Sequence, residues 1–442
     1  MALGVRRNCP KLAAVSNIWY AYNWLTRKWP WKIEEVLKQY GDVVRIAPNE
    51  LVFLIPQAGK DIHATHVKHL ETFVKTDFED LGEDGGISFE IDPVKHRDVA
   101  RRLSPAFSAR NAKAKEAVLH KYIDLFVDKM KAMEDEEGVE LRQWAHWLTM
   151  DVFADMTYNR QMNQMKNEKS SLLLNAVIKV NLFLTIQAVS KKFPLLGSLL
   201  YLFVLPSFWL TMPRVLKINS QEVHSRIERR GKTEHLDYCE QLIPRDAPAP
   251  RDQKQINYLE QIAGQLLMAG WELMSNQFYS SIFFLLNEPS AYKSLVNEIR
   301  SNNIYDGLPR MSPGAIVDSN YIPRGDICQI SHFAPARSSR YFSDPLEFRP
   351  QRWLPSNHPK YNNKYQNDNL KAFLPFNQGP RMCPACAIAW TQMKLYLAKV
   401  LWAFDLEAVP GQDLSFDRDF SVYTMWNKPK IWVRFLPVKS EE

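Results

Sequence analysis

The chain has 442 residues, of which 46% are hydrophobic and 12% aromatic, so it is long enough to bury a sizeable core and is not a disordered protein. The net charge of +7 is moderate and spread along the chain, and no basic tract is interleaved with aromatic residues, so we predict no nucleic-acid partner. The five cysteines form no disulfide framework, which favours a reducing compartment.

The start of the chain predicts a small part that contains β-structure. Residues 1–16 include arginines and a lysine but no apolar run, so we expect neither a signal peptide nor a spanning helix there. Trp31–Tyr40 has the pattern of a short helix that stops at Gly41. Val43–Ile55 is expected to form two strands around a turn at Ala47–Glu50.

Most of the remaining chain is predicted to be helical. Residues 111–133 carry apolar side chains at the spacing of one buried helix face, namely Leu119, Ile123, Phe126 and Met130. The helical pattern continues over 141–158 and 170–191, and the polar, proline-containing stretch 231–254 is expected to be a surface loop. Because no internal repeat is present, we predict a single domain over 1–442 that is mainly α with small β-sheets.

The most apolar stretch without a charge is Phe193–Met212. It is long enough to span a membrane, but it is interrupted by Pro194, Gly197 and Pro206. The prolines and the mid-chain position favour an interfacial element that dips into the membrane surface.

Gln253–Leu286 is apolar on nearly every face and, as one helix, is about 50 Å long. A helix of this kind belongs inside a large core. Within it, Ala269 and Gly270 are small residues and Glu272 is a carboxylate in a dry environment, and the resemblance of residues 269–274 to a known motif makes these three candidate functional residues. The alternatives are that the small residues ease helix packing and that Glu272 is a buried acid paired for structural reasons.

Two further segments predict short strands. Residues 308–325 read as short strands with a tight turn, and they contain Arg310. Residues 404–438 alternate as a terminal hairpin does, and the tip near Thr424–Trp426 is expected to line a pocket.

The loop Phe376–Cys383 is followed by a helical pattern from Pro384 to about Trp402. At a helix start, free N–H groups and the helix dipole lower the pKa of a cysteine, and Arg381 adds a cation, so we expect Cys383 to be a thiolate that can bind a metal. Gly379 lets the backbone approach a flat group or take a positive φ. The alternatives are that Cys383 and Cys386 form a dithiol or half a zinc site, or that Cys383 is a plain buried cysteine.

This loop resembles the haem-binding loop of cytochrome P450, F-x-x-G-x-R-x-C-x-G. Phe376, Gly379, Arg381 and Cys383 fill the first four fixed positions, and Ala385 replaces the last glycine. The resemblance implies haem b with the Cys383 thiolate as the proximal iron ligand. It also implies that Phe376 packs on the sulfur side and that Arg381 reaches a haem propionate.

Residues 269–274 resemble the distal motif of this family, A-G-x-[DE]-T-[TS]. By this resemblance Gly270 leaves room over the iron and Glu272 is the acid of the motif. Leu273 stands where a threonine hydroxyl supports proton delivery, and leucine has neither donor nor acceptor.

Residues 96–108 resemble the C-helix of the family, whose side chains contact the propionates. His96 takes the aromatic position, and Ala100 stands where an arginine is usual, so Arg97 or Arg101 would substitute. The resemblance also implies that Arg310 binds a propionate. A solvated basic helix face is the alternative for this cluster.

Two family features are missing, so the resemblance implies a partly truncated cytochrome P450 fold. Residues 1–16 would be the remnant after a membrane anchor, and no E-x-x-R helix is found between Ser301 and Arg310. Residues 348–353 resemble the meander that holds the third member of the E-x-x-R triad, so Arg352 is expected to lack its partners.

The resemblance implies a haem-thiolate monooxygenase of fungal secondary metabolism. It would hydroxylate or epoxidise an apolar terpenoid or polyketide substrate with O2. Its electrons would come from NADPH through cytochrome P450 reductase, docked on a basic face with Arg381, Lys394 and Lys399. In this family residues 193–212 correspond to the membrane-dipping region between helices F and G, which implies the cytosolic face of the endoplasmic reticulum membrane. The alternatives are a catalytically impaired haem-thiolate protein and a non-haem, membrane-associated dithiol protein.

Overall fold

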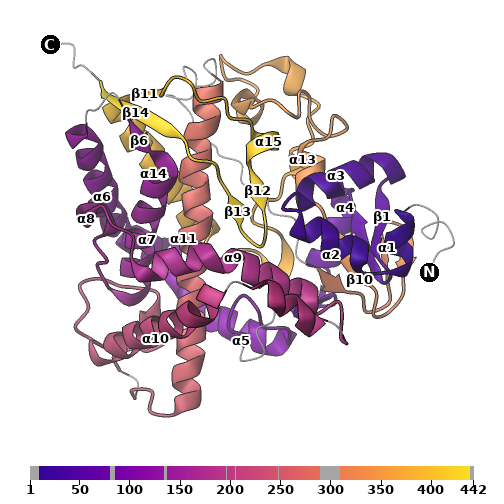
Figure 1. Ribbon diagram of the computed structural model, residues 1–442, viewed down its shortest axis with the longest axis horizontal. Helices are drawn as coiled ribbons and strands as arrows, with labels where there is room; N and C mark the ends of the chain where they lie inside the picture. Colours follow the sequence, from indigo (N-terminus) through magenta and orange to yellow (C-terminus); the bar gives the residue numbers. More distant parts are fainter. Residues whose placement is uncertain are drawn as a thin grey trace.

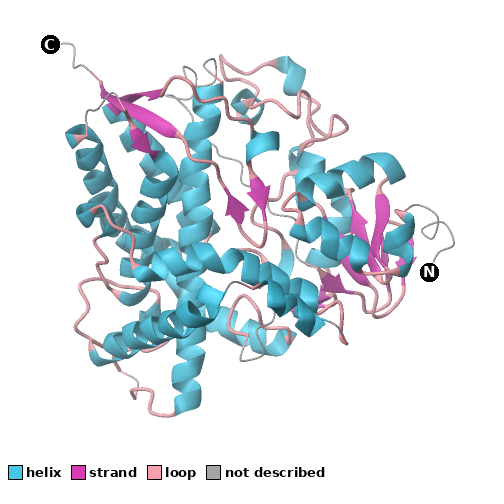
Figure 2. Ribbon diagram, in the orientation of Figure 1, coloured by secondary structure: helices cyan, strands magenta, loops and turns pink. Residues whose placement is uncertain are grey.

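One helix, α11 (Gln253–Asn287), runs through the middle of the molecule in the computed structural model (Figure 1). The structure describes residues 9–79, 85–133, 137–195, 197–204, 206–246, 248–288 and 309–438. Helices α6, α7 and α14 lie on one side of α11, and a smaller part with the largest sheet lies on the other (Figures 1 and 2). The predicted helix Gln253–Leu286 is therefore found within one residue of its expected end.

The helices make up the largest share of the described residues. Their bounds are α1 Lys11–Val15, α2 Ile18–Leu25, α3 Trp29–Tyr40, α4 Pro56–Gly59, α5 Pro93–Leu103, α6 Ala109–Ala132, α7 Leu141–Tyr158, α8 Gln164–Asn167, α9 Leu172–Ser190, α10 Pro206–Glu228, α13 Phe333–Ala336, α14 Cys386–Ala403 and α15 Phe416–Asp419. Short turns used below are η1 Lys60–Ala64, η4 Gly197–Phe203 and η9 Gly379–Arg381.

The strands are short. Their bounds are β1 Val43–Ala47, β2 Glu50–Phe53, β3 His66–Val67, β4 Leu70–Glu71, β5 Val74–Lys75, β6 Val139–Glu140, β7 Arg310–Met311, β8 Ala315–Val317, β9 Asn320–Ile322, β10 Ile327–Ile330, β11 Phe404–Ala408, β12 Ser421–Val422, β13 Trp426–Asn427 and β14 Trp432–Pro437. The architecture confirms the predicted class, mainly α with small β-sheets.

The largest sheet joins both ends of the sequence, in the strand order β1-β2-β10-β7-β5. Strands β1 and β2 form the expected hairpin, with Val44 opposite Val52, and β10 runs parallel to β2. Its inward side chains are apolar and fully buried, which gives this part of the chain a core of its own. Strand β7 follows as an inner strand, so Arg310 is held between β10 and β5.

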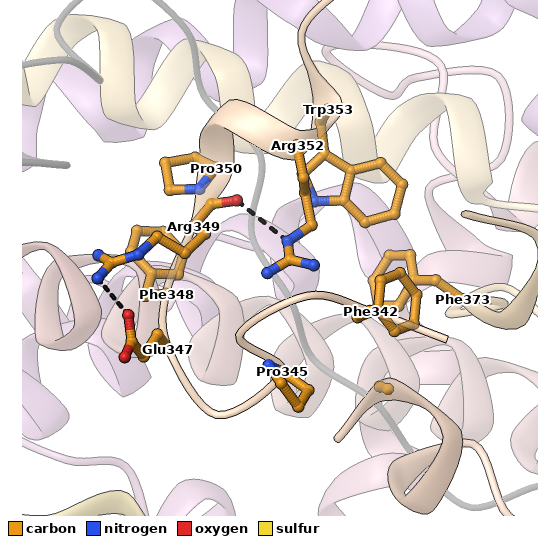
Figure 3. Close-up of a pocket in the computed structure, with 10 residues that line it drawn as sticks. Phe342, Pro345, Glu347, Phe348, Arg349, Pro350, Arg352, Trp353 and Phe373 are labelled. Carbon is orange, nitrogen blue, oxygen red and sulfur yellow. Dashed lines mark hydrogen bonds and ion pairs between the residues drawn. The ribbon is translucent and has the colours of Figure 1, made fainter. Parts of the chain in front are cut away.

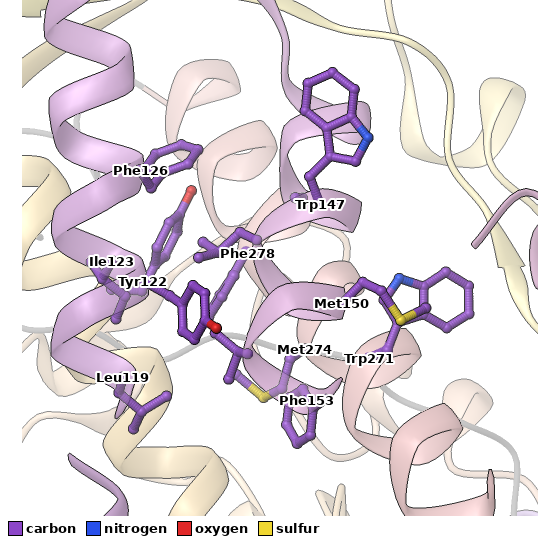
Figure 4. Packing of buried hydrophobic residues seen from close by; sticks show 14 of the residues in the cluster. Leu119, Tyr122, Ile123, Phe126, Trp147, Met150, Phe153, Trp271, Met274 and Phe278 are labelled. Atoms are coloured by element: carbon purple, nitrogen blue, oxygen red, sulfur yellow. The ribbon is translucent and has the colours of Figure 1, made fainter. Parts of the chain in front are cut away.

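The main core lies between α6, α7, α11 and α14 (Figure 4). The four apolar residues predicted to form one face of α6, Leu119, Ile123, Phe126 and Met130, are all at most 2% exposed. Phe126 meets Tyr396 of α14 and Trp144 of α7 at ring distances of 5.8 and 6.2 Å. The period of 3.6 residues therefore identified the buried face correctly.

The terminal hairpin is present, and the segment between its two strands also contacts α9. Phe404 of β11 pairs with Pro437 of β14, as the alternation predicted. The segment between them folds back toward the middle of the molecule, where Met425 N–H donates to Asn181 of α9 and Thr185 bonds Thr424. This contact ties the predicted tip of the hairpin to α9, which is far away in the sequence.

Residues 193–212 do not form one element. They contain η4 and the first turns of α10, and several apolar side chains are exposed, among them Leu195 (91%), Leu202 (80%) and Leu210 (71%). Among the described residues, the helix that is long and apolar enough to cross a membrane, judged by length and composition, is α9. More than half of its apolar window is buried, which is also typical of a core helix.

Candidate active site

The loop around Cys383 is held tightly by its own backbone and by the sheet-containing part. The N–H of Cys383 donates to the carbonyl of Phe376 at 2.9 Å. Gly379 has φ +79°, and a Cβ there would lie 1.9 Å from the carbonyl oxygen of His63 in η1. Glycine is therefore required at this position for two reasons, the positive φ and the close approach of two backbones.

The Cys383 thiol lies partly exposed in a turn that precedes α14, and this corrects the expected helix start. Helix α14 begins at Cys386 with Ala385 as its N-cap, so Pro384 is not in the first helical turn. The N–H of Ala385 donates to the sulfur, but burial is the larger effect and raises the pKa of Cys383 above its usual value. The expected lowering of this pKa is wrong for the protein alone. A bound metal ion, which deprotonates a coordinating thiol, would reverse it.

The pKa of the neighbouring thiol shifts in the same direction. Cys386, the first residue of α14, is also a free thiol, and burial raises its pKa, with a side-chain hydrogen bond to Trp390 acting in the opposite direction. Among the described residues, no group of three or more His, Cys, Asp or Glu side chains is placed to hold a metal ion. A zinc site built from protein ligands therefore has no support in that part of the chain.

Cationic side chains from η9, β5 and β7 gather around a buried, neutral histidine beside the loop. His96 of α5 is 6% exposed, and its pKa is lowered to about 3 by burial and by the charges of Arg381, Lys75 and Arg310. His63 is similarly buried, its pKa is lowered by burial and then by Arg310, and its Nε2 has no hydrogen-bond partner. The structure thus brings three predicted residues together, His96, Arg310 and Arg381.

Arg381 shows what this cluster can bind. Its Nε donates to Glu71 Oε1 at 2.6 Å, and its Nη1 makes a short hydrogen bond to the carbonyl of Glu90. Burial lowers the pKa of Arg381, and Glu71 offsets part of that cost. Among the charges that act on His96, three are cationic, so a ligand with two carboxylates at one edge suits this donor set.

Arg101 does not join the cluster. Its side chain is 77% exposed and pairs with Asp98 at 3.4 Å on the outer face of α5. Arg97 is exposed as well. The positive charge near His96 comes instead from Lys75, a buried lysine that no sequence motif selects.

Helix α11 presents two different faces at the distal motif. Ala269 and Leu273 are one turn apart and exposed, Leu273 by 37%, on a helix whose neighbouring residues are mostly buried. A Cβ on Gly270 would lie 2.0 Å from the ring of Phe153 in α7, which Figure 4 shows beside Met274. Gly270 therefore allows α7 and α11 to approach, and the uncovered apolar surface is that of Ala269 and Leu273.

Glu272 is 8% exposed and bonded within α11. Its Oε1 accepts a hydrogen bond of 2.6 Å from Asn276 Nδ2, four residues later. Lys428 of the C-terminal segment lies at the other end of Asn276 and donates to Asn276 Oδ1 at 2.6 Å. The sequence did not point to Lys428, because a lysine in Lys-Pro-Lys reads as surface.

Arg352 is paired, although within the described residues its partner is not from an E-x-x-R motif, and the expected lack of E-x-x-R partners stays a prediction. Its Nη1 donates to Asp368 Oδ2 at 2.5 Å, and its Nη2 donates to the Ser343 carbonyl at 2.7 Å. Figure 3 shows the guanidinium beside Trp353, while Arg349 is turned toward Glu347. The stretch 289–308, where an E-x-x-R helix and the helix ending near Ser301 were sought, lies outside the described residues.

The sequence model described as cytochrome P450 matches residues 12–303 and 300–433. This match spans nearly the whole chain. The chain belongs to the cytochrome P450 family.

Individual relatives are similar to this chain over nearly its whole length. The P450 is 44% identical to the cytochrome P450 monooxygenase TwmD of Talaromyces wortmannii, over 97% of this chain and 90% of the relative. It is 30% identical to the monooxygenase poxC of Penicillium oxalicum, over 96% and 88%. It is 28% identical to BOA3 of Botryotinia fuckeliana, over 96% and 90%. The resemblance to fungal P450 monooxygenases is confirmed, and the protein is an oxidoreductase of that kind.

The matches also bear on the missing E-x-x-R helix. The family match is divided into two blocks that adjoin at residues 300–303, where the motif was sought. The alignment with TwmD runs over 461 positions, more than the 442 residues of this P450, so the relative has residues that this chain lacks.

Proposed function

We propose that this P450 binds haem b with the Cys383 sulfur as the proximal ligand and oxygenates an apolar substrate. The observation that carries the proposal is the combination of a half-buried cysteine, whose sulfur accepts the Ala385 N–H, with buried cations from η9, β5 and β7 gathered around His96. When bound, a haem-thiolate supplies activation of O2, because the thiolate donates electron density that favours O–O cleavage.

Each of the gathered residues has a defined part. Arg381, His96 and Arg310 bind the propionate edge, and Lys75 adds charge to the same side. Phe376, whose ring lies 6.0 Å from that of Trp390, shields the sulfur from water. Ala269 and Leu273 form the apolar surface of α11 that limits water on the distal side. Glu272 is a buried carboxylate on the same helix, next to Leu273 in the sequence. Arg101 has no part in the site.

The proposed substrate class is supported by the exposed apolar surface of α11 and by the similarity to fungal P450 monooxygenases. Leu273 offers apolar contact and no hydrogen bond, which suits a terpenoid or polyketide scaffold of secondary metabolism. The reaction is hydroxylation or epoxidation with O2 and electrons from NADPH through cytochrome P450 reductase. Lys394 is exposed on α14, and Lys399 is bonded to Asp124, so Lys394 is the lysine available to an acidic partner.

The cytosolic face of the endoplasmic reticulum membrane is the proposed location. Leu195, Leu202 and Leu210 are exposed around η4 and α10, an arrangement that suits insertion into a lipid interface. We expect the triple change of these leucines to Ser to abolish sedimentation with phosphatidylcholine vesicles and to leave the visible spectrum unaltered. Equal sedimentation of the variant and the parent would remove the membrane from the proposal.

The central test compares two neighbouring cysteines. Cys383→Ser should lose the reduced carbon monoxide band to which the family owes its number, while Cys386→Ser, three residues away, should keep it. If Cys383→Ser keeps the wild-type band, another group is the ligand and the proposal fails. If Cys386→Ser also loses the band while remaining folded by circular dichroism, the dithiol interpretation gains over the haem one.

A haem-thiolate protein with impaired turnover is the second candidate, and Leu273 favours it because it carries no hydroxyl. Leu273→Thr separates the two. In an impaired protein this change should raise the product formed per NADPH consumed several-fold, whereas in an enzyme that has another proton source it should leave the ratio nearly unchanged.

A further inference from the structure

Lys428 is a buried ammonium in the C-terminal segment, directly after β13. It is 5% exposed, and its Nζ donates to Asn276 Oδ1 at 2.6 Å and to Ser275 Oγ at 3.1 Å. The same atom lies 5.7 Å from the centre of the Tyr279 ring, within cation–π distance. Burial lowers the pKa of Lys428 to about 7, and Glu272 acts in the opposite direction.

Asn276 connects this ammonium to the distal carboxylate. Its amide oxygen accepts from Lys428 while its Nδ2 donates 2.6 Å to Glu272 Oε1. The amide dipole is therefore aligned between a positive and a negative group, and it stabilises both charges at once. If Lys428 were neutral or Glu272 protonated, the charge at that end of the arrangement would be lost.

The other charged groups near Lys428 are largely compensated among themselves. Arg142 Nη1 donates to the Lys428 carbonyl at 3.0 Å, and Arg142 Nε lies 3.5 Å from Glu140. His146 of α7 is buried, and its pKa is lowered well below its usual value by burial and then by Lys428 and Arg142. A neutral His146 adds no charge. Glu272 is therefore the carboxylate whose charge Lys428 balances through Asn276.

Water has access to the Lys428 end of this chain of hydrogen bonds. A cavity of about 460 Å³ is lined by Asn276 and Lys428, and it extends to Asp417, which is 52% exposed. A cavity of this size with polar walls holds several water molecules. The Lys428 end of these hydrogen bonds therefore borders a polar cavity that extends to the exposed Asp417.

We infer that Lys428 is a positioning residue of the P450 reaction, which through Asn276 keeps the Glu272 carboxylate ionised and turned along α11. In this P450 the state of the distal acid is then set by a lysine from the C-terminal segment, where Leu273 leaves no hydroxyl to fix it. The inference rests on the proposed function, since it assigns Glu272 to the oxygenation site.

A double-mutant cycle tests the link without any reaction. We expect Lys428→Met to lower the denaturant midpoint of the haem-containing protein, because it leaves a buried carboxylate without its counter-charge. The double variant Lys428→Met with Glu272→Gln should regain most of this loss. Lys115→Met is the matched control, a 1% exposed lysine 5.0 Å from the Tyr238 ring, and Glu272→Gln should not rescue it. Additive effects in the Lys428 cycle would overturn the inference.

A pH profile tests the role in the reaction. With reductase and NADPH, the hydrogen peroxide released per NADPH should change with pH, and the midpoint of Lys428→Met should lie at least about one unit above that of the parent. Lys428→Arg should restore the parent midpoint. An unchanged midpoint in Lys428→Met overturns the inference even if the carbon monoxide band is normal, whereas absence of that band in the parent overturns the proposed function and leaves the unfolding cycle readable.

Discussion

The pair Arg352–Asp368 offers a direct test of how this P450 tolerates the absence of an E-x-x-R partner among the described residues. The two side chains are 8% and 1% exposed, and Asp368 also accepts the Ser343 N–H at 2.8 Å. Asp368→Ala leaves the guanidinium buried with only carbonyl acceptors and removes the acceptor of Ser343. Breaking one partner of a buried pair costs about 3–5 kcal/mol, so we expect a loss of that size.

Guanidinium unfolding followed by tryptophan fluorescence measures this cost, provided that the slope with denaturant is unchanged. Asp368→Asn keeps an oxygen for the Ser343 N–H and should fall between the wild type and Asp368→Ala. The matched control is Asp42→Ala, which breaks an exposed pair with Arg340, whose side chains are 51% and 36% exposed. That loss should be about 0–1 kcal/mol.

The outcome that would refute this reasoning is equality of the two losses. If Asp368→Ala costs no more than Asp42→Ala, then Arg352 is hydrated or finds another acid, and the pair does not replace the family triad. The haem content after purification should follow the unfolding free energy, because Arg352 lies in the segment that precedes the Cys383 loop.

Three further changes follow from contacts around the site. Gly379→Ala adds a Cβ 1.9 Å from the His63 carbonyl at φ +79°, so haem retention should fall at least tenfold in a haem-transfer assay, and unaltered retention would contradict the contact. Gly270→Ala overpacks Phe153 and should cost about 1–3 kcal/mol in unfolding, while Phe153→Leu in the same chain should recover part of it. The pKa of His96 is about 3 in the folded protein against 6.5 unfolded, so unfolding takes up a proton and stability falls as pH drops below about 6.5. His96→Phe should reduce the slope of unfolding free energy between pH 4 and 6 by up to about 1.4 kcal/mol per pH unit in haem-free protein, and a slope equal to that of the parent would contradict the assignment.

Local pattern was sufficient for the elements whose periodicity is strong. The helix 141–158 was predicted with both ends correct, and the apolar face of α6 was identified by four residues at helical spacing. The helix after Cys383 was placed too early, because Pro384 is favoured in a first helical turn. In the structure, residues 384 and 385 form a turn that brings the Ala385 N–H to the Cys383 sulfur. Helix propensity does not predict such a contact.

The candidate site was predictable where a motif fixes both residue type and spacing. The Cys383 loop is of this kind, and the comparisons agree with the family it indicated. Lys75, Lys428 and Asp368 were not predictable, because each acts on a residue at least 16 positions away and each is of a type that is usually exposed. Arg101 shows the reverse case, since a charge next to a motif was selected by proximity in sequence and lies on the solvent side.

The contact between Gly379 and His63 has a consequence for biosynthesis. The two backbones that meet there come from opposite ends of the chain, so the cradle for the cofactor does not exist until the ribosome has released almost the entire polypeptide. Cofactor capture is then a late event that follows docking of the sheet-containing part. Nascent chains stalled before residue 379 should incorporate no haem, however long they are held.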